Sequence, residues 1–435
     1  MALFLGYKGG DVLSWRATKD LFAELDTIFT EKSSFILNNE KMDLLREFRD
    51  SLTDEIAFEE RFTRDLNRTF EELERAEFED QLQPLFVTFQ RMAREYFEKR
   101  GSVIALQGIC NAYHDAVLRK ILQFAEEGMV LDELGRPPVP YCWLVSGAAG
   151  RSEQALNNML QPYLVYDCIA NSPAAYFEKL SYRITTILKK TGLITGGERE
   201  FIRKFFWRGS REDWRQWLVR ELDEKRTAPH FILPALPSLS TPFRPLGKEN
   251  NALYATVAAV ADLRPLTGDE ALSTALVDLA YEKLASFRET AAFDHLARQV
   301  TVSPVALNMF GWFKVEKRGK HRGDVDIERH ALSPLVMNIG LFALKYDIRE
   351  TNTLGRIREL LQRGRLNVDL AERVVSAYHE INLLILRLQM GEGSNEGAFI
   401  SPEELSEDDS HKLKQALETV INLQKITHHD FTEQI

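Results

Sequence analysis

Residues 141–154 read YCWLVSGAAGRSEQ, an apolar run that ends in a turn of small residues. The six residues 141–146 are aromatic and branched, and their short length favours a buried strand over a helix. Gly147 and Gly150 permit positive φ and close backbone approach, and residues 152–158 can continue as a short helix whose free N–H groups face the turn. The stretch therefore predicts a strand, a glycine turn and a helix. Such a turn can hold phosphate, although many α/β proteins use one simply to reverse direction.

The sequence from residue 141 to 166 resembles the signature of nucleotidyltransferases related to the protein-PII uridylyltransferases, within the DNA polymerase β-like superfamily. The matching positions are Trp143, Leu144, Gly147, Gly150, Arg151, Glu153, Gln154, Leu164 and Tyr166. Later segments resemble the same family in the same order, at residues 207–214 (WRGSREDW), 261–269 (ADLRPLTGD), 326–336 (DIERHALSPLV) and 351–354 (TNTL). Each match is short, but their shared order from about residue 101 to the C-terminus is specific.

The resemblance implies a triphosphate site at the glycine turn, formed by Gly147, Ala148, Gly150, Arg151, Glu153 and Gln154. It also implies that two aspartates of a D-x-D motif, with a third from a neighbouring strand, hold two magnesium ions that neutralise the triphosphate. In register, the D-x-D positions are Met159 and Gln161. A thioether does not serve a hard cation, and an amide supplies one uncharged oxygen. Asp262 aligns with the third carboxylate and survives alone.

Other departures from the family pattern point the same way. Ala148 replaces a phosphate-contacting serine, Pro162 replaces the asparagine after D-x-D, Glu328 stands where the family has lysine, and Gly340 where it has arginine. Asp167 is no substitute ligand for the same metal. It lies six residues after Gln161, and six residues along a strand cover about 20 Å. We therefore expect a degenerate site with no resident metal and no cofactor. Magnesium is expected only if catalysis survives by another arrangement.

Each candidate residue also has a structural interpretation. Asp262 can pair with Arg264 or cap the following helix, and this role is favoured over a metal site because its two partners are missing. Arg151 can bind an anion, or pair with Glu153 or with a distant acid. Trp207, Trp214 and Trp217 can line a base pocket, but tryptophans at such spacing favour core packing. His428, His429 and Asp430 lack further ligands and are expected in a solvated tail.

Composition sets the broad class. The 435 residues are 44% hydrophobic and 28% charged, which is ordinary for a globular protein. A net charge of -10 argues against a broad nucleic-acid or membrane surface, so we expect neither as a partner. The basic run at residues 314–322 is expected to be a solvated loop, or in a minority interpretation an anion-contacting one. Three cysteines without paired spacing and no long apolar segment indicate reduced thiols and a cytoplasmic location.

The pattern predicts a mostly helical α+β protein. Residues 1–135 form a helical N-terminal region, residues 136–270 a small polymerase-β-like domain with a mixed sheet, and residues 271–435 a helical bundle that the resemblance relates to substrate binding. Within the middle region we expect a second strand at residues 163–169, a helix at 174–190, and a third strand or buried segment at 253–261. A last helix is expected to begin near Pro402, with Ser401 as its N-cap.

Two functions follow as hypotheses. In the first, the chain is a noncatalytic regulatory protein in signal transduction that uses the inherited fold to bind a nucleotide or a protein. In the second, it is an active metal-dependent nucleotidyltransferase that modifies a regulatory protein. The sequence does not identify the nucleotide, the acceptor or the oligomeric state.

Overall fold

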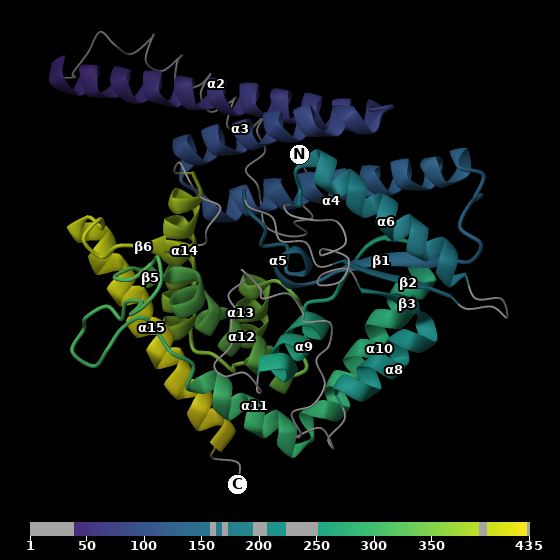
Figure 1. Cartoon of the computed structure of the whole chain (residues 1–435). Helices are drawn as coiled ribbons and strands as arrows, with labels where there is room; N and C mark the ends of the chain where they lie inside the picture. Colours follow the sequence, from purple (N-terminus) through teal and green to yellow (C-terminus); the bar gives the residue numbers. More distant parts are fainter. Residues whose placement is uncertain are drawn as a thin grey trace. The chain divides into compact units, whose positions relative to one another are not determined.

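The computed structural model describes residues 39–156, 162–167, 173–194, 207–222, 251–390 and 398–432. The chain divides into two compact units, residues 1–72 and residues 73–435 (the main unit). Helix α2 (Asn39–Arg75) accounts for the described part of the first unit and ends just inside the second. Figure 1 shows the elements along the chain. The three-region division expected from the sequence stays a prediction.

The main unit begins with helices that precede the sheet: η1 (Glu79–Gln81), α3 (Leu82–Arg100) and α4 (Val103–Leu131). Helix α3 ends at Gly101, whose φ of 61° is the left-handed conformation that glycine adopts without strain. The Ser102 hydroxyl then caps α4 by accepting the Ala105 N–H at 3.4 Å. Phe89 of α3 stacks on Tyr113 of α4, with ring centroids 3.8 Å apart. Helices α3 and α4 lie in the N-terminal region that the sequence predicts to be helical.

A four-stranded mixed sheet lies at the centre of the main unit. Its strands run in the order β3 (Trp207–Ser210), β2 (Pro162–Tyr166), β1 (Tyr141–Val145) and β4 (Arg264–Gly268). Strand β1 pairs antiparallel with β2 and β4, whereas β2 and β3 are parallel. Helix α6 (Ala174–Thr191) links β2 to the chain before β3, and α8 (Arg211–Glu221) follows β3. The predicted mostly helical α+β class with a small mixed sheet is confirmed.

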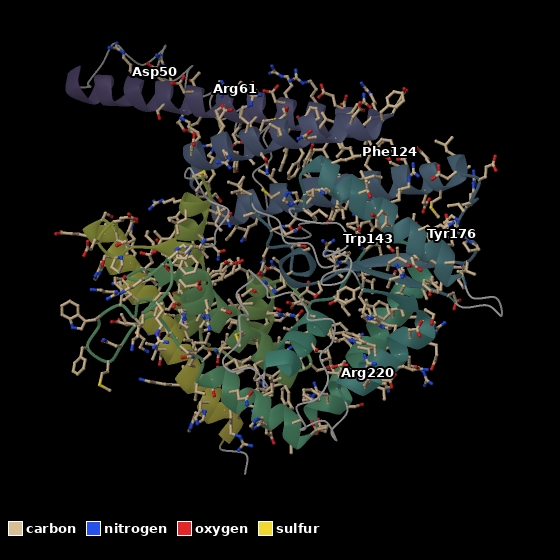
Figure 2. All side chains as sticks on the ribbon, viewed as in Figure 1. Asp50, Arg61, Phe124, Trp143, Tyr176 and Arg220 are labelled. Atoms are coloured by element: carbon tan, nitrogen blue, oxygen red, sulfur yellow. The ribbon has the colours of Figure 1, made fainter. Side chains whose placement is uncertain are left out.

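Strand β1 is buried on both of its faces. Cys142 and Leu144 belong to an apolar cluster that also contains side chains of α8, α9 (Asn251–Ala261) and α10 (Glu270–Arg288). On the opposite face, Phe177 of α6 lies 5.3 Å from the ring of Tyr141 and stacks on Tyr166 of β2 at 4.4 Å. Figure 2 labels Trp143, which lies on the same strand and is fully buried. Double-sided burial explains why this strand reads as an uninterrupted apolar run.

One local prediction in the middle region is wrong, and another is right only in part. The helix after β1 is α5 (Gly147–Gly150), only four residues long, and the chain then turns at Ser152 with φ of 55° instead of continuing as a helix. The described residues 152–156 contain no helix, and residues 157–158 lie outside the described part. Residues 253–261 belong to helix α9 and not to a strand, because their many alanines favour a helix. The alternative of a buried segment is borne out, since Val257, Val260 and Ala261 are buried.

The remaining helices and a short second sheet form the C-terminal part of the main unit. Its elements are α11 (Ala291–Thr301), β5 (Val325–Asp326), the π-helix η2 (Glu328–Leu332), α12 (Ser333–Lys345), α13 (Thr353–Gln362), α14 (Val368–Met390), β6 (Phe399–Ile400) and α15 (Glu407–Thr432). The predicted start near Pro402 is wrong, because the Ser406 hydroxyl accepts the Asp409 N–H and begins α15 one turn later. Among the described helices, none has the length and apolar character to cross a membrane.

His114 predicts a specific dependence of stability on pH. It lies on α4 and is buried against α3, where its ring lies 5.9 Å from that of Phe86, and no described residue hydrogen-bonds to its Nδ1. Burial lowers the pKa of His114 to about 4, with Asp115 opposing the shift. The unfolded chain binds this proton near pH 6.5 but the folded chain does not. Titration of His114 therefore leaves the free energy of unfolding unchanged above about pH 6.5 and lowers it by roughly 2–3 kcal/mol as the pH drops to 4.

Urea denaturation at several pH values tests this expectation by comparing the wild type with His114→Phe. The difference in unfolding free energy between the two proteins should change by roughly 2–3 kcal/mol between pH 7.5 and pH 4 in favour of the variant. A constant difference would show that His114 does not cause the acid sensitivity.

Candidate functional site

The glycine turn after β1 is packed directly against the backbone of Asp262. A Cβ placed on Gly150 would lie 1.8 Å from the Asp262 carbonyl oxygen, so no side chain fits there. Gly147 begins the turn with φ of 62°, and the hydroxyl of the preceding Ser146 donates to the Ala259 carbonyl at 2.6 Å. Gly147 therefore provides the turn conformation, and Gly150 allows the turn to approach the backbone just after α9.

The Asp262 carboxylate lies between two arginines. Arg151 Nη1 donates to Asp262 Oδ2 at 2.6 Å, and Arg356 Nη2 donates to Asp262 Oδ1 at 2.8 Å. Each of the three side chains is only 4% exposed. The expected pairing of Asp262 with Arg264 is wrong, because Asp262 is enclosed by these two guanidinium groups.

Arg264 instead joins the turn to helix α4. Its guanidinium forms a bidentate pair with Asp115 at 2.8 and 3.0 Å, and also donates to the Ala149 carbonyl at 2.9 Å. Side chains from α4 and β4 thus hold the turn from a second direction.

Arg151 takes the pairing role rather than being left open for an anion. Its Nε donates to Glu153 at 2.7 Å while its Nη1 reaches Asp262, so both acids considered from the sequence are partners. Burial by itself would lower the pKa of Arg151, but Glu153 and Asp262 together raise it above its usual value. The other Glu153 oxygen accepts the Thr353 N–H at 2.6 Å. Arg151, Glu153, Asp262 and Arg356, called here the charge network, therefore contain two cations and two carboxylates.

Residues 350–356 connect this network to the start of α13. The Thr351 hydroxyl donates to the Gly150 carbonyl at 2.9 Å, and the Asn352 amide donates to the Arg151 carbonyl at 3.0 Å. Arg356 also donates to the Glu350 carbonyl at 2.7 Å. Sequence reasoning missed Arg356, and the available signal was its place two residues after the family-like TNTL segment.

Helix α4 supplies a polar contact on the far side of the turn. The Asn111 side chain and the Gln154 backbone exchange two hydrogen bonds, at 3.3 and 3.4 Å. Gln154 is 2% exposed, yet neither its Oε1 nor its Nε2 has a hydrogen-bond partner among the described residues. A buried amide without a partner is costly, so both atoms can accept or donate a hydrogen bond to a group outside the described residues.

The described residues do not fit a magnesium site. Both oxygens of Asp262 bind guanidinium groups, and these fixed positive charges oppose a divalent cation at the same carboxylate. No group of three or more histidine, cysteine, aspartate or glutamate side chains in the described part of the chain is arranged to hold a metal. Met159 and Gln161, the predicted degenerate metal positions, lie outside the described residues.

The two positions where the family has a cation, Gly340 and Glu328, lie in different surroundings. Gly340 of α12 lies beside the network, because a Cβ built there would be 3.6 Å from Arg356 Nη1. Glu328 lies in η2, where burial and the nearby charge of Asp326 raise its pKa to about 8. A carboxyl group that stays protonated to such a pH lacks a compensating cation.

Other predicted residues are structural. Trp214 and Trp217 are buried and stacked at 5.0 Å, with Trp207 and Tyr163 packed around them, which favours the core role. Residues 428–430 do not form the expected tail, because they lie in a helix, although His428 and His429 are exposed to solvent as expected. Asp430 lies in α15 and binds Lys345 at 2.8 Å, because that helix packs against α12.

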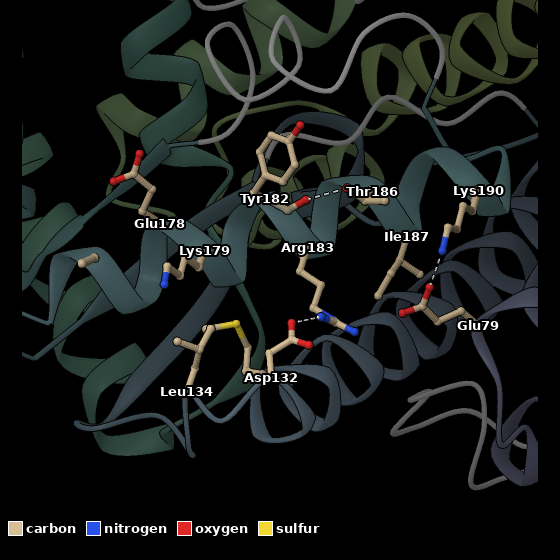
Figure 3. A pocket seen from close by; sticks show the side chains of 12 residues that line it. Glu79, Asp132, Leu134, Glu178, Lys179, Tyr182, Arg183, Thr186, Ile187 and Lys190 are labelled. Carbon is tan, nitrogen blue, oxygen red and sulfur yellow. Dashed lines mark hydrogen bonds and ion pairs between the residues drawn. The ribbon is translucent and has the colours of Figure 1, made fainter.

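A separate surface cavity of about 920 Å³ opens beside α6 (Figure 3). Two ion pairs border it, Arg183 with Asp132 at 2.6 Å and Lys190 with Glu79 at 2.8 Å. No residue of the glycine turn or of the charge network lines this cavity. It is therefore a different place from the predicted phosphate site.

The class of this protein follows from comparison with known families. Residues 87–228 match the family described as putative nucleotidyltransferase DUF294, and residues 290–431 match that described as putative nucleotidyltransferase substrate binding domain. Together the matches cover about two thirds of the chain. The chain belongs to this nucleotidyltransferase family. No curated protein matches it.

The close contact at Gly150 gives a first testable prediction. In Gly150→Ala the new methyl group meets a backbone carbonyl that cannot move freely, so the unfolding free energy should fall by roughly 2 kcal/mol or more. Gly340→Ala is the matched control, because its methyl group enters ordinary contact and alanine is the better helix former by up to about 1 kcal/mol. Urea denaturation measures both. Equal effects of the two substitutions would contradict the proposed packing role of Gly150.

Glu328 gives a second prediction, on alkaline stability. Its folded-state pKa is raised, so its contribution is complete below about pH 4.5 and is lost as the pH rises to about 8. Glu328→Gln removes this titration, and the variant should gain roughly 2–4 kcal/mol over the wild type between pH 5 and pH 8.5. Denaturation across this range measures the difference, with the surface variant Glu359→Gln as control. Parallel curves for wild type and Glu328→Gln would refute the assignment.

Proposed function

We propose that this protein is a catalytically degenerate member of its nucleotidyltransferase family. In this proposal it resembles the protein-PII uridylyltransferases in origin and acts in signal transduction in the cytoplasm, as a regulatory protein that binds a nucleotide or another protein. Asp262 is a structural counter-ion in this protein and not a metal ligand.

The observation that carries the proposal is the pairing of both Asp262 oxygens with arginines, at 2.6 and 2.8 Å. A magnesium ion needs oxygen ligands whose negative charge is available to it. Here the charge of Asp262 is already balanced within a buried and nearly neutral network. Recruiting Asp262 to a metal would leave the buried Arg356 with backbone carbonyls but no carboxylate partner, and breaking a buried ion pair typically costs about 3–5 kcal/mol.

Sequence and structure support the proposal independently. Met159 and Gln161 remove the expected carboxylates by substitution. In the charge network, the remaining aspartate, Asp262, pairs with two arginines, and this pairing opposes metal binding. Either change weakens metal binding, and together they remove the charge that an in-line phosphoryl displacement requires.

The turn retains features that suit a ligand without catalysis. Gly147, Gly150 and the buried amide of Gln154 remain at the positions that the resemblance assigns to a nucleotide. The unpartnered atoms of Gln154 can donate to and accept from a nucleotide group that enters the turn. The expected binding is metal-independent, because the described acids provide no metal site.

A combined binding and transfer experiment tests the proposal. Calorimetry with ATP and UTP, each with and without magnesium, should show affinities that differ by less than about threefold between the two conditions, since no metal bridges protein and phosphate. Labelled ATP or UTP, incubated with the protein and a PII-type regulator, should leave both proteins unlabelled.

Asp262→Asn and Asp115→Asn distinguish this proposal from an active enzyme. Both remove one buried carboxylate that pairs with arginine, but only Asp262 aligns with the catalytic position. Magnesium-dependent labelling by the wild type that survives in Asp115→Asn and disappears in folded Asp262→Asn would establish the active alternative. Melting temperatures of both variants check that they are folded.

A further inference from the structure

Between α11 and β5 the chain makes two successive loops, and the first exposes large apolar side chains. Residues 306–314 are closed by the Lys314 N–H, which donates to the Ala306 carbonyl at 3.0 Å. Met309, Phe310 and Trp312, called here the apolar tip, are 91%, 76% and 70% exposed. A cluster of such residues on a surface indicates an interaction site rather than ordinary surface composition.

The apolar tip is held in a defined turn. Asn308 Oδ1 accepts the N–H groups of Phe310 and Trp312, at 2.9 and 3.1 Å. Gly311 supplies a φ of 76°, and Leu307 and Phe313 pair across the base of the loop. The backbone is therefore satisfied inside the loop, and the three side chains are directed outward by its geometry.

The second loop is basic. Glu316 and Gly323 close it, with Gly323 N–H donating to the Glu316 carbonyl at 2.9 Å. Three of its cations, Lys317, Arg318 and Arg322, form no ion pair with any described residue, and neither does Lys314 at the end of the first loop. Residues 306–324 contain five Lys or Arg and two acids, a net charge of +3 in a chain of net charge -10.

The base of this basic loop is anchored to the main unit. His321 stacks on Phe399 of β6, with ring centroids 3.8 Å apart and planes 7° from parallel. Strand β5, which follows the loop, pairs with β6. Figure 1 shows the segment as the green loop that extends outward beside β5. The apolar tip and the cations are thus presented together from a fixed support.

We propose that the apolar tip and the basic loop bind the surface of a bilayer that contains anionic phospholipid. Tryptophan prefers the interfacial zone of a membrane, and Met309 and Phe310 can enter the acyl boundary beside it. The unpaired cations complement lipid phosphates, which provides the second signal that stable surface attachment requires. The side chains of the apolar tip are 70–91% exposed, so they suit a deformable interface that needs no matching pocket.

This inference departs from the expectation of no membrane partner. That expectation used the net charge of the whole chain, whereas the electrostatic attraction of a surface acts over about one Debye length and depends on the local charge. The protein would lie on the bilayer without spanning it.

Vesicle co-sedimentation of the full chain tests the proposal. Vesicles of phosphatidylcholine with about one-third phosphatidylglycerol should bind at least about tenfold more protein than vesicles of phosphatidylcholine alone. The triple variant Met309→Ser, Phe310→Ser, Trp312→Ser should lose about tenfold in partitioning, as should Lys317→Glu with Arg318→Glu. Brominated lipid should quench wild-type fluorescence, and Trp312→Phe should abolish that quenching.

Leu131→Ser is the matched control, because it removes an 81% exposed apolar side chain elsewhere in the main unit. It should leave vesicle binding unchanged. Absence of wild-type binding to the anionic vesicles overturns the proposal, as does equal loss in Leu131→Ser. Light scattering without lipid tests the alternative that the tip binds a second copy of the chain. If the wild type does not bind vesicles and its mass falls to the monomer value in the triple variant, the tip is a self-association site.

Discussion

The pairing of Asp262 with Arg151 and Arg356 is the interaction on which the candidate site depends. It joins three segments that are distant in sequence: the turn after β1, the end of α9 and the start of α13. All three side chains are nearly inaccessible, so the charges are screened by one another and not by water. Gly150 permits this arrangement by allowing the turn to touch the Asp262 backbone.

Under the proposed function, this arrangement explains how the family fold persists without metal chemistry. A lone aspartate in a low-dielectric interior needs a partner cation, and without magnesium the arginines supply the required charge. Gly340, where the family has arginine, lies close to Arg356 and leaves the space beside it open. The same residues that would otherwise support catalysis thus contribute to holding the sheet against the helical C-terminal part.

The sequence predicted the elements whose burial is two-sided or strongly periodic. Strand β1 and helix α6 were predicted to within about a residue, because a continuous apolar run and a helical stripe are unambiguous signals. Strand β4 was missed, since Arg264, Pro265 and Thr267 give an edge strand no apolar pattern.

The helix expected after the glycine turn failed because hydrogen bonds from distant segments fix the backbone at Arg151 and Gln154. The partners of Asp262 depended in the same way on tertiary contacts. Arg356 reaches Asp262 only when residues about one hundred positions apart fold together, and local sequence does not predict such a contact. The family resemblance brought the correct segments to attention, but it did not say which cation would fill the space.

The two regions that match family descriptions are not independent modules. Tyr378 of α14 hydrogen-bonds with Gln107 of α4, and Met337 and Leu341 of α12 belong to the same apolar cluster as the sheet. A cut between these regions would expose apolar surface on both fragments. It would also separate Arg151 from Arg356, the two arginines that pair with Asp262. A recombinant that kept one region and replaced the other would therefore have to preserve the interface residues of both.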